Sequence, residues 1–247
     1  MGSIAILADI HGNLPALEAV VADMQQRRID MVVNLGDHAS GPLWPNETLT
    51  FLMQQPWLQI AGNHDRQLVQ QRPSNHGASD RYAFERLNSD QKAWLRALPA
   101  QARLAPDILL CHGTPTNDSS YLLETVKYGT VCLARPADII DRLAGIDAQV
   151  VLCGHSHIPR LVQVSDTVLI VNPGSVGVPA YEDVEPEPHV VETGSPHARY
   201  ALLEQHRRGW RSEFVSVPYD YMSAARQAQR NGRLDWEIGL RTGYMRE

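Results

Sequence analysis

The 247-residue sequence predicts an α/β protein that folds as one domain over residues 1–247. Short apolar runs alternate with amphipathic helical patterns through about the first 175 residues, which is typical of βαβ units with parallel strands. Polar residues gather where those apolar runs end. Hydrophobic residues make up 43% of the chain, which is enough to fill the core of a large single domain.

Five apolar runs in the first part of the chain are expected to be buried strands. They lie at residues 4–8, 30–35, 57–61, 107–111 and 149–153. After the first run, apolar residues from Leu14 to Met24 recur at helical spacing and predict an amphipathic helix. Further helices are expected between the later strands, at about 46–55, 80–97 and 130–144.

The second part of the chain has the pattern of hairpins rather than of crossovers. One hairpin is expected from residues 160–164 and 168–172, and another from 199–205 and 210–217 around Arg207-Arg208-Gly209. The segment 178–198 between them holds four prolines and five acidic residues, so we expect an irregular excursion there. Residues 219–247 are expected to form a helical tail, broken near Asn231-Gly232.

Charge and composition exclude several classes of protein. The net charge is −6, so no overall positive field attracts nucleic acid, and we expect no specific nucleic-acid binding. No stretch approaches the roughly 20 apolar residues that span a bilayer, and the first residues lack the pattern of a signal peptide. The three cysteines are widely spaced without a C-x-x-C pair, which is typical of reduced thiols in a cytoplasmic protein.

Histidine, aspartate and asparagine follow each of the five predicted strands. In open α/β sheets the carboxyl ends of the strands form the edge where ligands bind, so these side chains are expected to meet there. In chain order they are Asp9, His11, Asp37, Asn63, His64, Asp65, His112, His155 and His157.

Each of these residues also has an ordinary structural interpretation. Aspartate and asparagine after a strand often cap a helix or begin a turn, and a single histidine is often a satisfied core residue. His155 and His157 alone are compatible with an acid–base pair, two metal ligands or a turn, although residues two apart in a strand point to the same side. Because five of the ten histidines lie at strand ends beside Gly, Asp or Asn, the set as a whole indicates a functional site.

Imidazole and carboxylate groups without thiolate favour divalent Mn, Fe, Co, Ni or Zn. Seven candidate ligands are too many for one tetrahedral ion and suit two ions that share a bridging carboxylate. Two ions about 3.5–4 Å apart can hold the attacking and leaving oxygens of a phosphoryl transfer. Two dications against two carboxylates would also give the site a positive charge that attracts phosphate into an acidic protein.

The blocks D-x-H, G-D, G-N-H-D, a lone histidine after a strand and G-H-x-H, in that order, resemble the calcineurin-like metallophosphoesterase superfamily over about residues 4–178. The stretches "ADIHGNLPALEAV" and "VNPGSVG" are most similar to its small prokaryotic phosphodiesterase and dinucleoside-polyphosphate hydrolase branches. The resemblance implies a four-layer αββα sandwich of two mixed β-sheets flanked by helices.

The resemblance also implies roles for individual residues. One metal ion would be held by Asp9, His11 and His157, the other by Asn63, His112 and His155, with Asp37 bridging them, and a metal-bridging hydroxide would attack phosphorus in line. His64 would protonate the leaving oxygen or stabilise charge on the phosphate, and Asp65 would orient it. We also expect Asn13 and His64 to contact the substrate.

Two positions depart from the superfamily pattern. Gly41 stands where the protein serine/threonine phosphatases carry a phosphate-binding arginine, which disfavours a phosphoprotein substrate. Ala180 follows Pro179 where relatives of this branch often have arginine, so a substrate-contacting cation is expected to be missing. The segment 178–198 either reshapes the site or is a disordered surface loop. Likewise Tyr121, Tyr128 and Tyr181 either stack on a nucleobase or are ordinary surface residues.

The expected function is hydrolysis of a small phosphate ester: a phosphodiester, a nucleotide or a dinucleoside polyphosphate. The alternatives are a phosphomonoesterase, a scaffold protein on the same fold and a dinuclear amidohydrolase. Retention of His64 and of every ligand argues against the scaffold, and the G-N-H-D block argues against the amidohydrolase. Sequence alone leaves the metal, the leaving group and the oligomeric state open.

Overall fold

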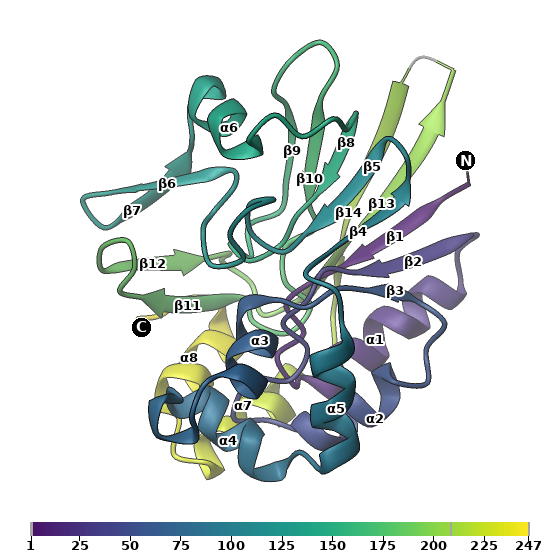
Figure 1. Cartoon of the computed structure of the whole chain (residues 1–247). Coiled ribbons are helices and arrows are strands. Elements are labelled where there is room, and N and C mark those ends of the chain that lie inside the picture. The colour runs from purple at the N-terminus through teal and green to yellow at the C-terminus, as the bar shows by residue number, and fades with distance from the viewer. Residues whose placement is uncertain (1, 208, 247) are drawn as a thin grey trace.

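Two five-stranded mixed sheets pack face to face in the computed structural model, which describes residues 2–207 and 209–246 (Figure 1). Met1, Arg208 and Glu247, which belong to the predicted domain, hairpin turn and helical tail, lie outside the described residues.

The first sheet has the order β14-β13-β1-β2-β3. Its strands β1, β2 and β3 run parallel, while β13 pairs antiparallel with β1 and β14 antiparallel with β13. The bounds are β1 (Ile4–Leu7), β2 (Met31–Asn34), β3 (Leu58–Gln59), β13 (Ala198–His206) and β14 (Gly209–Val217).

The second sheet has the order β4-β5-β8-β10-β9. Here β5, β8 and β10 run parallel, with the antiparallel strands β4 and β9 at the edges. The bounds are β4 (Gln101–Ala105), β5 (Ile108–Cys111), β8 (Val150–Leu152), β9 (Arg160–Gln163) and β10 (Leu169–Asn172).

Alternation along β1 shows how the layers form, because successive strand residues point to opposite faces. Ile4 and Ile6 pack between the two sheets, against residues of β5, β8 and β10. Ala5 and Leu7 point outward onto the helical layer of α1 (Leu14–Gln25), α2 (Pro45–Leu52) and α5 (Ser89–Ala97). Helix α6 (Pro136–Leu143) covers the outer face of the second sheet (Figure 1). The predicted four-layer αββα sandwich is therefore confirmed.

Several local predictions differ from the structure. The helix expected at 80–97 is two helices, α4 (Ala78–Arg86) and α5, because Asn88 accepts a hydrogen bond from the Gln91 N–H (2.9 Å) and caps a new helix. The helix expected at 130–144 begins as β7 (Thr130–Leu133), which pairs with the unpredicted β6 (Glu124–Lys127). The unpredicted helix α3 (Asn63–Gln70) is followed by a 3₁₀ turn (Pro73–Asn75).

The prediction that segment 178–198 is irregular is wrong. It contains the antiparallel pair β11 (Ala180–Asp183) and β12 (His189–Glu192). All four prolines of the segment lie outside the paired residues, so none removes a hydrogen bond from the ladder. The tail forms α7 (Tyr221–Arg230) and α8 (Leu234–Thr242), and α8 packs on β11, where Gly239 lies against the Ala180 carbonyl.

All three cysteines are free; Cys111 and Cys153 are buried and Cys132 is exposed. Within residues 2–207 and 209–246, no helix combines the length and apolar character needed to cross a membrane.

Candidate metal centre and active-site cleft

The loops that follow β1, β2, β5 and β8 converge where the two sheets meet, above α3 in Figure 1. Five predicted ligands on these loops have left-handed φ angles, between 51° and 70°: Asp9, His11, Asp37, His155 and His157. This region is uncommon for residues other than glycine and costs on the order of 1 kcal/mol or more each. Backbone strain is thus concentrated at one edge, which is typical of a functional site.

His155 and His157 lie beyond the end of β8 at Leu152, so the prediction that they share one side of a strand is wrong. The left-handed backbone at each residue aims the two imidazoles at different partners. His155 lies with Asp37 and His112, whereas His157 lies with Asp9 and His11.

Those six residues form two groups of three. Within each group, the candidate ligand atoms all lie within 4.8 Å of one another. Asp37 Oδ2 stands between the groups, 3.7 Å from His11 Nε2 and 3.2 Å from His112 Nε2. Asn63 Oδ1 is 3.0 Å from His112 Nε2 and adds an amide oxygen to the second group. The structure therefore brings together all seven predicted metal ligands, in the predicted division.

The hydrogen bonds of the histidines fit metal ligation. In three of them, Nδ1 lies 2.7, 2.8 or 2.9 Å from a backbone carbonyl oxygen: His11, His112 and His157. A carbonyl only accepts, so Nδ1 carries the proton and the Nε2 lone pair faces the cluster. Buried Asp9 Oδ1 and His11 Nε2 have no hydrogen-bond partner among the described residues. Divalent cations would satisfy these converging lone pairs, so the donor set fits two metal ions.

The electrostatics support the same fit. Burial lowers the pKa of His11 and of His155 to about 4, so both are neutral near pH 7 and ready to bind a cation. Burial also lowers the pKa of His112, but Asp37 and Asp9 outweigh it and raise that pKa to about 10. His112 Nε2 thus lies in a negative field that a proton or a metal ion can neutralise.

Close glycine packing explains how the loops that carry Asp37 and Asn63 can approach each other. A Cβ added at Gly62 would lie 2.2 Å from Asp37 Oδ1, and one at Gly36 would lie 2.4 Å from the Gly62 nitrogen. Gly36 also has a φ of +103°, which favours glycine. The loops after β2 and β3 can therefore touch only because both carry glycine at the contact.

His64 is the second residue of α3 and lines the cleft beside the two groups. Its ring is 5.5 Å from that of His11, and its Nδ1 donates to Asp80 Oδ1 at 2.9 Å. Asp80, on α4, also accepts a 2.6 Å hydrogen bond from Ser40 Oγ. Burial lowers the pKa of His64, but Asp37 and Asp80 outweigh it and raise the pKa to about 9. The imidazole is thus held as a proton donor facing the cleft.

The prediction that Asp65 orients His64 is wrong, because Asp80 does so. Fully buried Asp65 instead accepts from the backbone N–H groups of Asp37, His38 and Gly62 and from His38 Nδ1, at 2.7–3.0 Å. As the third residue of α3, Asp65 points back to the helix start rather than along its neighbour's side chain. Its role is to fix the backbone of Asp37.

Asn13, predicted to contact substrate, is fully buried and does not line the cleft. Its Oδ1 accepts from the Ala16 N–H (3.3 Å) and caps α1, and its Nδ2 donates to the Gly177 carbonyl (2.8 Å) and to Tyr219 (3.0 Å). Asn13 therefore joins the first block to the "VNPGSVG" block and has a structural role.

The cleft beside the two ligand groups has a volume of about 390 Å³. Its walls come from α3, α4, the 178–198 segment and α8, so that segment borders the site. Trp236 of α8 lies over Gly41, where an added Cβ would be 2.8 Å from the indole ring. The position used by an arginine in the serine/threonine phosphatases is thus filled here by tryptophan. Arg233 also lines the cleft, but its guanidinium is paired with Asp235 and does not replace the cation missing at Ala180.

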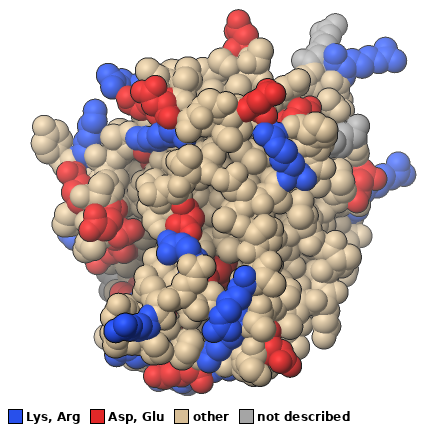
Figure 2. All heavy atoms as spheres, viewed as in Figure 1, with Lys and Arg blue, Asp and Glu red and all other residues tan. Residues whose placement is uncertain are grey.

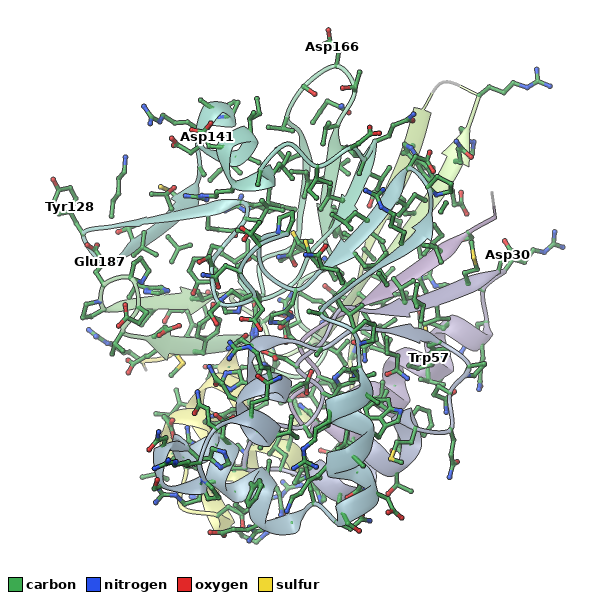
Figure 3. The ribbon with its side chains drawn as sticks, in the orientation of Figure 1. Asp30, Trp57, Tyr128, Asp141, Asp166 and Glu187 are labelled. Carbon is green, nitrogen blue, oxygen red and sulfur yellow. The ribbon has the colours of Figure 1, made fainter. Side chains whose placement is uncertain are left out.

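The three tyrosines differ in their surroundings. Tyr128 is 99% exposed at the β6–β7 turn, away from the cleft (Figure 3). Tyr181 lines the cleft, with its ring 4.6 Å from that of His157. Tyr121 packs on His155 at 5.1 Å and its hydroxyl is 2.7 Å from that of Tyr181. Two of the tyrosines therefore support the metal histidines.

Residues 3–195 match the calcineurin-like phosphoesterase superfamily domain. The chain belongs to this superfamily. It is a metal-dependent phosphoric ester hydrolase, and its family implies divalent metal cofactors.

Similar proteins cover almost the whole chain at low identity. An uncharacterized protein of Methanocaldococcus jannaschii is 24% identical, over 94% of each chain. The crystal structure of a metallophosphoesterase from Sphaerobacter thermophilus superposes with a TM-score of 0.75 at 24% identity, covering 98% of this chain and 99% of the other. A hypothetical protein of Pyrococcus horikoshii gives 0.76 at 19% identity and 99% of each chain. These likenesses show that the α8 and β11–β12 regions belong to a shared fold.

Sequence reasoning missed the residues that approach the site from outside the motif blocks: Ser40, Asp80, Arg233 and Trp236. Ser40 lies three residues after Asp37, and that closeness was the one local signal for it. Asp80, Arg233 and Trp236 lie on helices whose docking depends on tertiary packing, and no local pattern marks them.

Proposed function

We propose that the protein is a dinuclear phosphoesterase that hydrolyses small phosphodiesters by in-line displacement at phosphorus. The observation that carries the proposal is the placement of two ligand groups, with Asp37 Oδ2 between them, in one cleft with His64. Mn, Fe, Co, Ni and Zn all suit this nitrogen and oxygen donor set. Two such ions, when bound, activate water and neutralise charge on the phosphate.

The chain's own residues would supply the proton and the orientation. Water adds to phosphorus while the bond from phosphorus to the alcohol oxygen breaks, and its electron pair leaves with that oxygen. His64 gives its proton to the leaving oxygen, so the products are a phosphomonoester and an alcohol. Asp80 and Ser40 hold the imidazole in place. The backbone N–H of His64 donates to Asp37 Oδ1 at 2.9 Å, which fixes the start of α3 beside the two ligand groups.

Phosphodiesters fit better than phosphoproteins. Trp236 covers the space above Gly41, and the cleft of about 390 Å³ is enclosed by α8 and β11. Such a cleft suits a small molecule rather than the side chain of a folded protein. Nucleotides and dinucleoside polyphosphates also belong to the set of substrates that the sequence predicts.

A metal and substrate survey tests the proposal. Metal-free protein is loaded with Mn, Co, Ni or Zn in turn and assayed with bis(p-nitrophenyl) phosphate and p-nitrophenyl phosphate. We expect metal-dependent turnover with preference for the diester and two ions per chain. His64→Ala is expected to lower kcat about 100-fold or more while the metal content stays at two. Unchanged turnover in that variant, or an inactive metal-loaded protein on a broad phosphate-ester panel, would contradict the proposal.

A further inference from the structure

The two ends of the cleft differ in chemistry. At the inner end, His11 is 95% buried and its Nε2 faces the two ligand groups. Among the described residues, this nitrogen has no hydrogen-bond partner. Four carboxylates line the more exposed outer end: Glu182, Asp183 and Glu185 of the β11–β12 hairpin, and Asp235 of α8. Figure 2 shows acidic side chains gathered over the hairpin region at the left of the view.

Asp235 is paired with Arg233, whereas the three hairpin carboxylates have no basic partner among the described residues that line the cleft. Arg233 is the one lysine or arginine that lines the cleft among the described residues. Its guanidinium is fully engaged, with Nε and Nη2 on Asp235 at 2.9 and 2.6 Å and Nη1 on Ser79 Oγ at 2.8 Å. Within the described chain, no lysine or arginine forms an ion pair with the three hairpin carboxylates. The three hairpin carboxylates therefore contribute a charge of about −3 to the outer half, and Arg246 lies in the adjoining hollow that Glu182 and Asp183 also line.

Two aromatic rings also line the cleft, beside the candidate ligand histidines. Tyr181 packs at 4.6 Å from the ring of His157, and Trp236 lies 6.1 Å from that of His11. Both line the cleft, so aromatic surfaces and carboxylates border the same space as the two ligand groups. Aromatic faces attract ammonium groups and tolerate flat neutral ones.

The geometry points to a phosphodiester with one phosphate and a cationic alcohol, such as an aminoalkyl or quaternary ammonium alcohol, as the substrate class of this cleft. The inference rests on the proposed phosphodiesterase function. The phosphate binds at the inner end, and the ammonium group lies between the rings and the hairpin carboxylates. A second or third phosphate in the outer half would instead meet unpaired negative charge, so polyphosphate chains are rejected.

The size of the cleft agrees with this assignment. About 390 Å³ is near the lower end of the range for small-molecule pockets, which is roughly 300–1,000 Å³. One phosphate and a small alcohol fill such a volume, whereas two nucleosides joined by several phosphates exceed it.

A pair of substrates that differ only in charge tests the inference. The first is p-nitrophenyl phosphorylcholine, and the second is p-nitrophenyl 3,3-dimethylbutyl phosphate, in which carbon replaces the ammonium nitrogen. We expect the metal-loaded protein to favour the choline ester in kcat/KM by about tenfold or more. Diadenosine tetraphosphate is expected to be the poorest substrate of a panel that includes it.

Two matched double variants separate the hairpin charges from charge in general. Glu182→Gln with Glu185→Gln removes two cleft carboxylates, and we expect the preference for the choline ester to fall about three- to tenfold. Asp141→Asn with Asp166→Asn makes the same charge change on exposed residues of α6 and the β9–β10 turn, far from β11 (Figure 3). That control is expected to leave the preference unchanged.

Binding to metal-free protein gives a readout that does not depend on activity. Isothermal titration with choline and with 3,3-dimethylbutanol is expected to show choline binding at least about fivefold tighter, and the hairpin variant to lose that difference. Phosphodiester turnover without any charge preference, and without tighter choline binding, would overturn the inference and leave the phosphodiesterase function standing. Choline binding in a protein that hydrolyses no phosphodiester would instead contradict the function.

Discussion

Replacement of Asp80 by asparagine tests whether His64 is positioned as the acid. The substitution keeps the shape of the side chain and the oxygen that accepts from His64 Nδ1 (2.9 Å) and Ser40 Oγ (2.6 Å), but removes the charge. A hydrogen bond to a charged group contributes about 1.5–3 kcal/mol. The His64 side chain is 33% exposed, so we take the lower end, which corresponds to a roughly 10- to 30-fold loss in kcat.

The assay compares two leaving groups in metal-loaded protein. Methyl phenyl phosphate needs protonation of its leaving oxygen more than methyl p-nitrophenyl phosphate does, so Asp80→Asn should slow the phenyl ester more. Loss of the Asp80 charge also lowers the pKa of His64, so the alkaline limb of kcat should move to lower pH. KM and metal content should change little.

Two outcomes would refute this reasoning. Equal loss for both leaving groups would mean that Asp80 does not act through a proton donor. A fall in metal content would mean that Asp80 supports the ligands instead. Ser40→Ala serves as a milder companion, because it removes one hydrogen bond to Asp80 and leaves the charge in place.

Three further predictions concern stability and metal binding. Asp65→Asn should lower the free energy of unfolding, measured by urea titration, by about 3 kcal/mol, because backbone N–H groups in the loops after β2 and β3 lose a carboxylate acceptor. An unchanged urea midpoint would refute this prediction. Gly62→Ala should reduce the metal content measured by elemental analysis, since its Cβ would lie 2.2 Å from Asp37 Oδ1, while Gly77→Ala, in open space, should not. Burial raises the pKa of the Glu124 carboxyl above 4.5, despite lowering by Ser156 and Arg160, so the proton is held more tightly in the folded state. Relative to Glu124→Gln, the free energy of unfolding of the native protein should therefore fall as pH rises from about 4.5 to 7, and a rise would show the opposite sign.

The central strands and the metal ligands were predictable because both depend on local sequence. Apolar runs mark β1, β2, β5 and β8, and the ligands follow directly at their carboxyl ends, where chain direction alone brings them together. The division of the seven ligands into two groups came from the resemblance to the superfamily, because the strand pattern alone does not separate His155 from His157.

The partner of His64 was not predictable, because proximity in sequence misleads within a helix. Successive helical residues point about 100° apart, so Asp65 turns to the backbone of its own helix start while Asp80 arrives from α4. The strands within 178–198 were not predictable for a related reason: proline content does not reveal the register, which places every proline outside the paired residues. Trp236 and Arg233 reach the cleft only through the docking of α8.

Anomalous diffraction from crystals grown with manganese tests the central claim most directly. We predict two peaks per chain, about 3.5–4 Å apart, with Asp37 between them. One should lie with Asp9, His11 and His157, and the other with His112. A single ion, or ions bound only at the carboxylates of the β11–β12 hairpin, would contradict the dinuclear phosphoesterase proposed here.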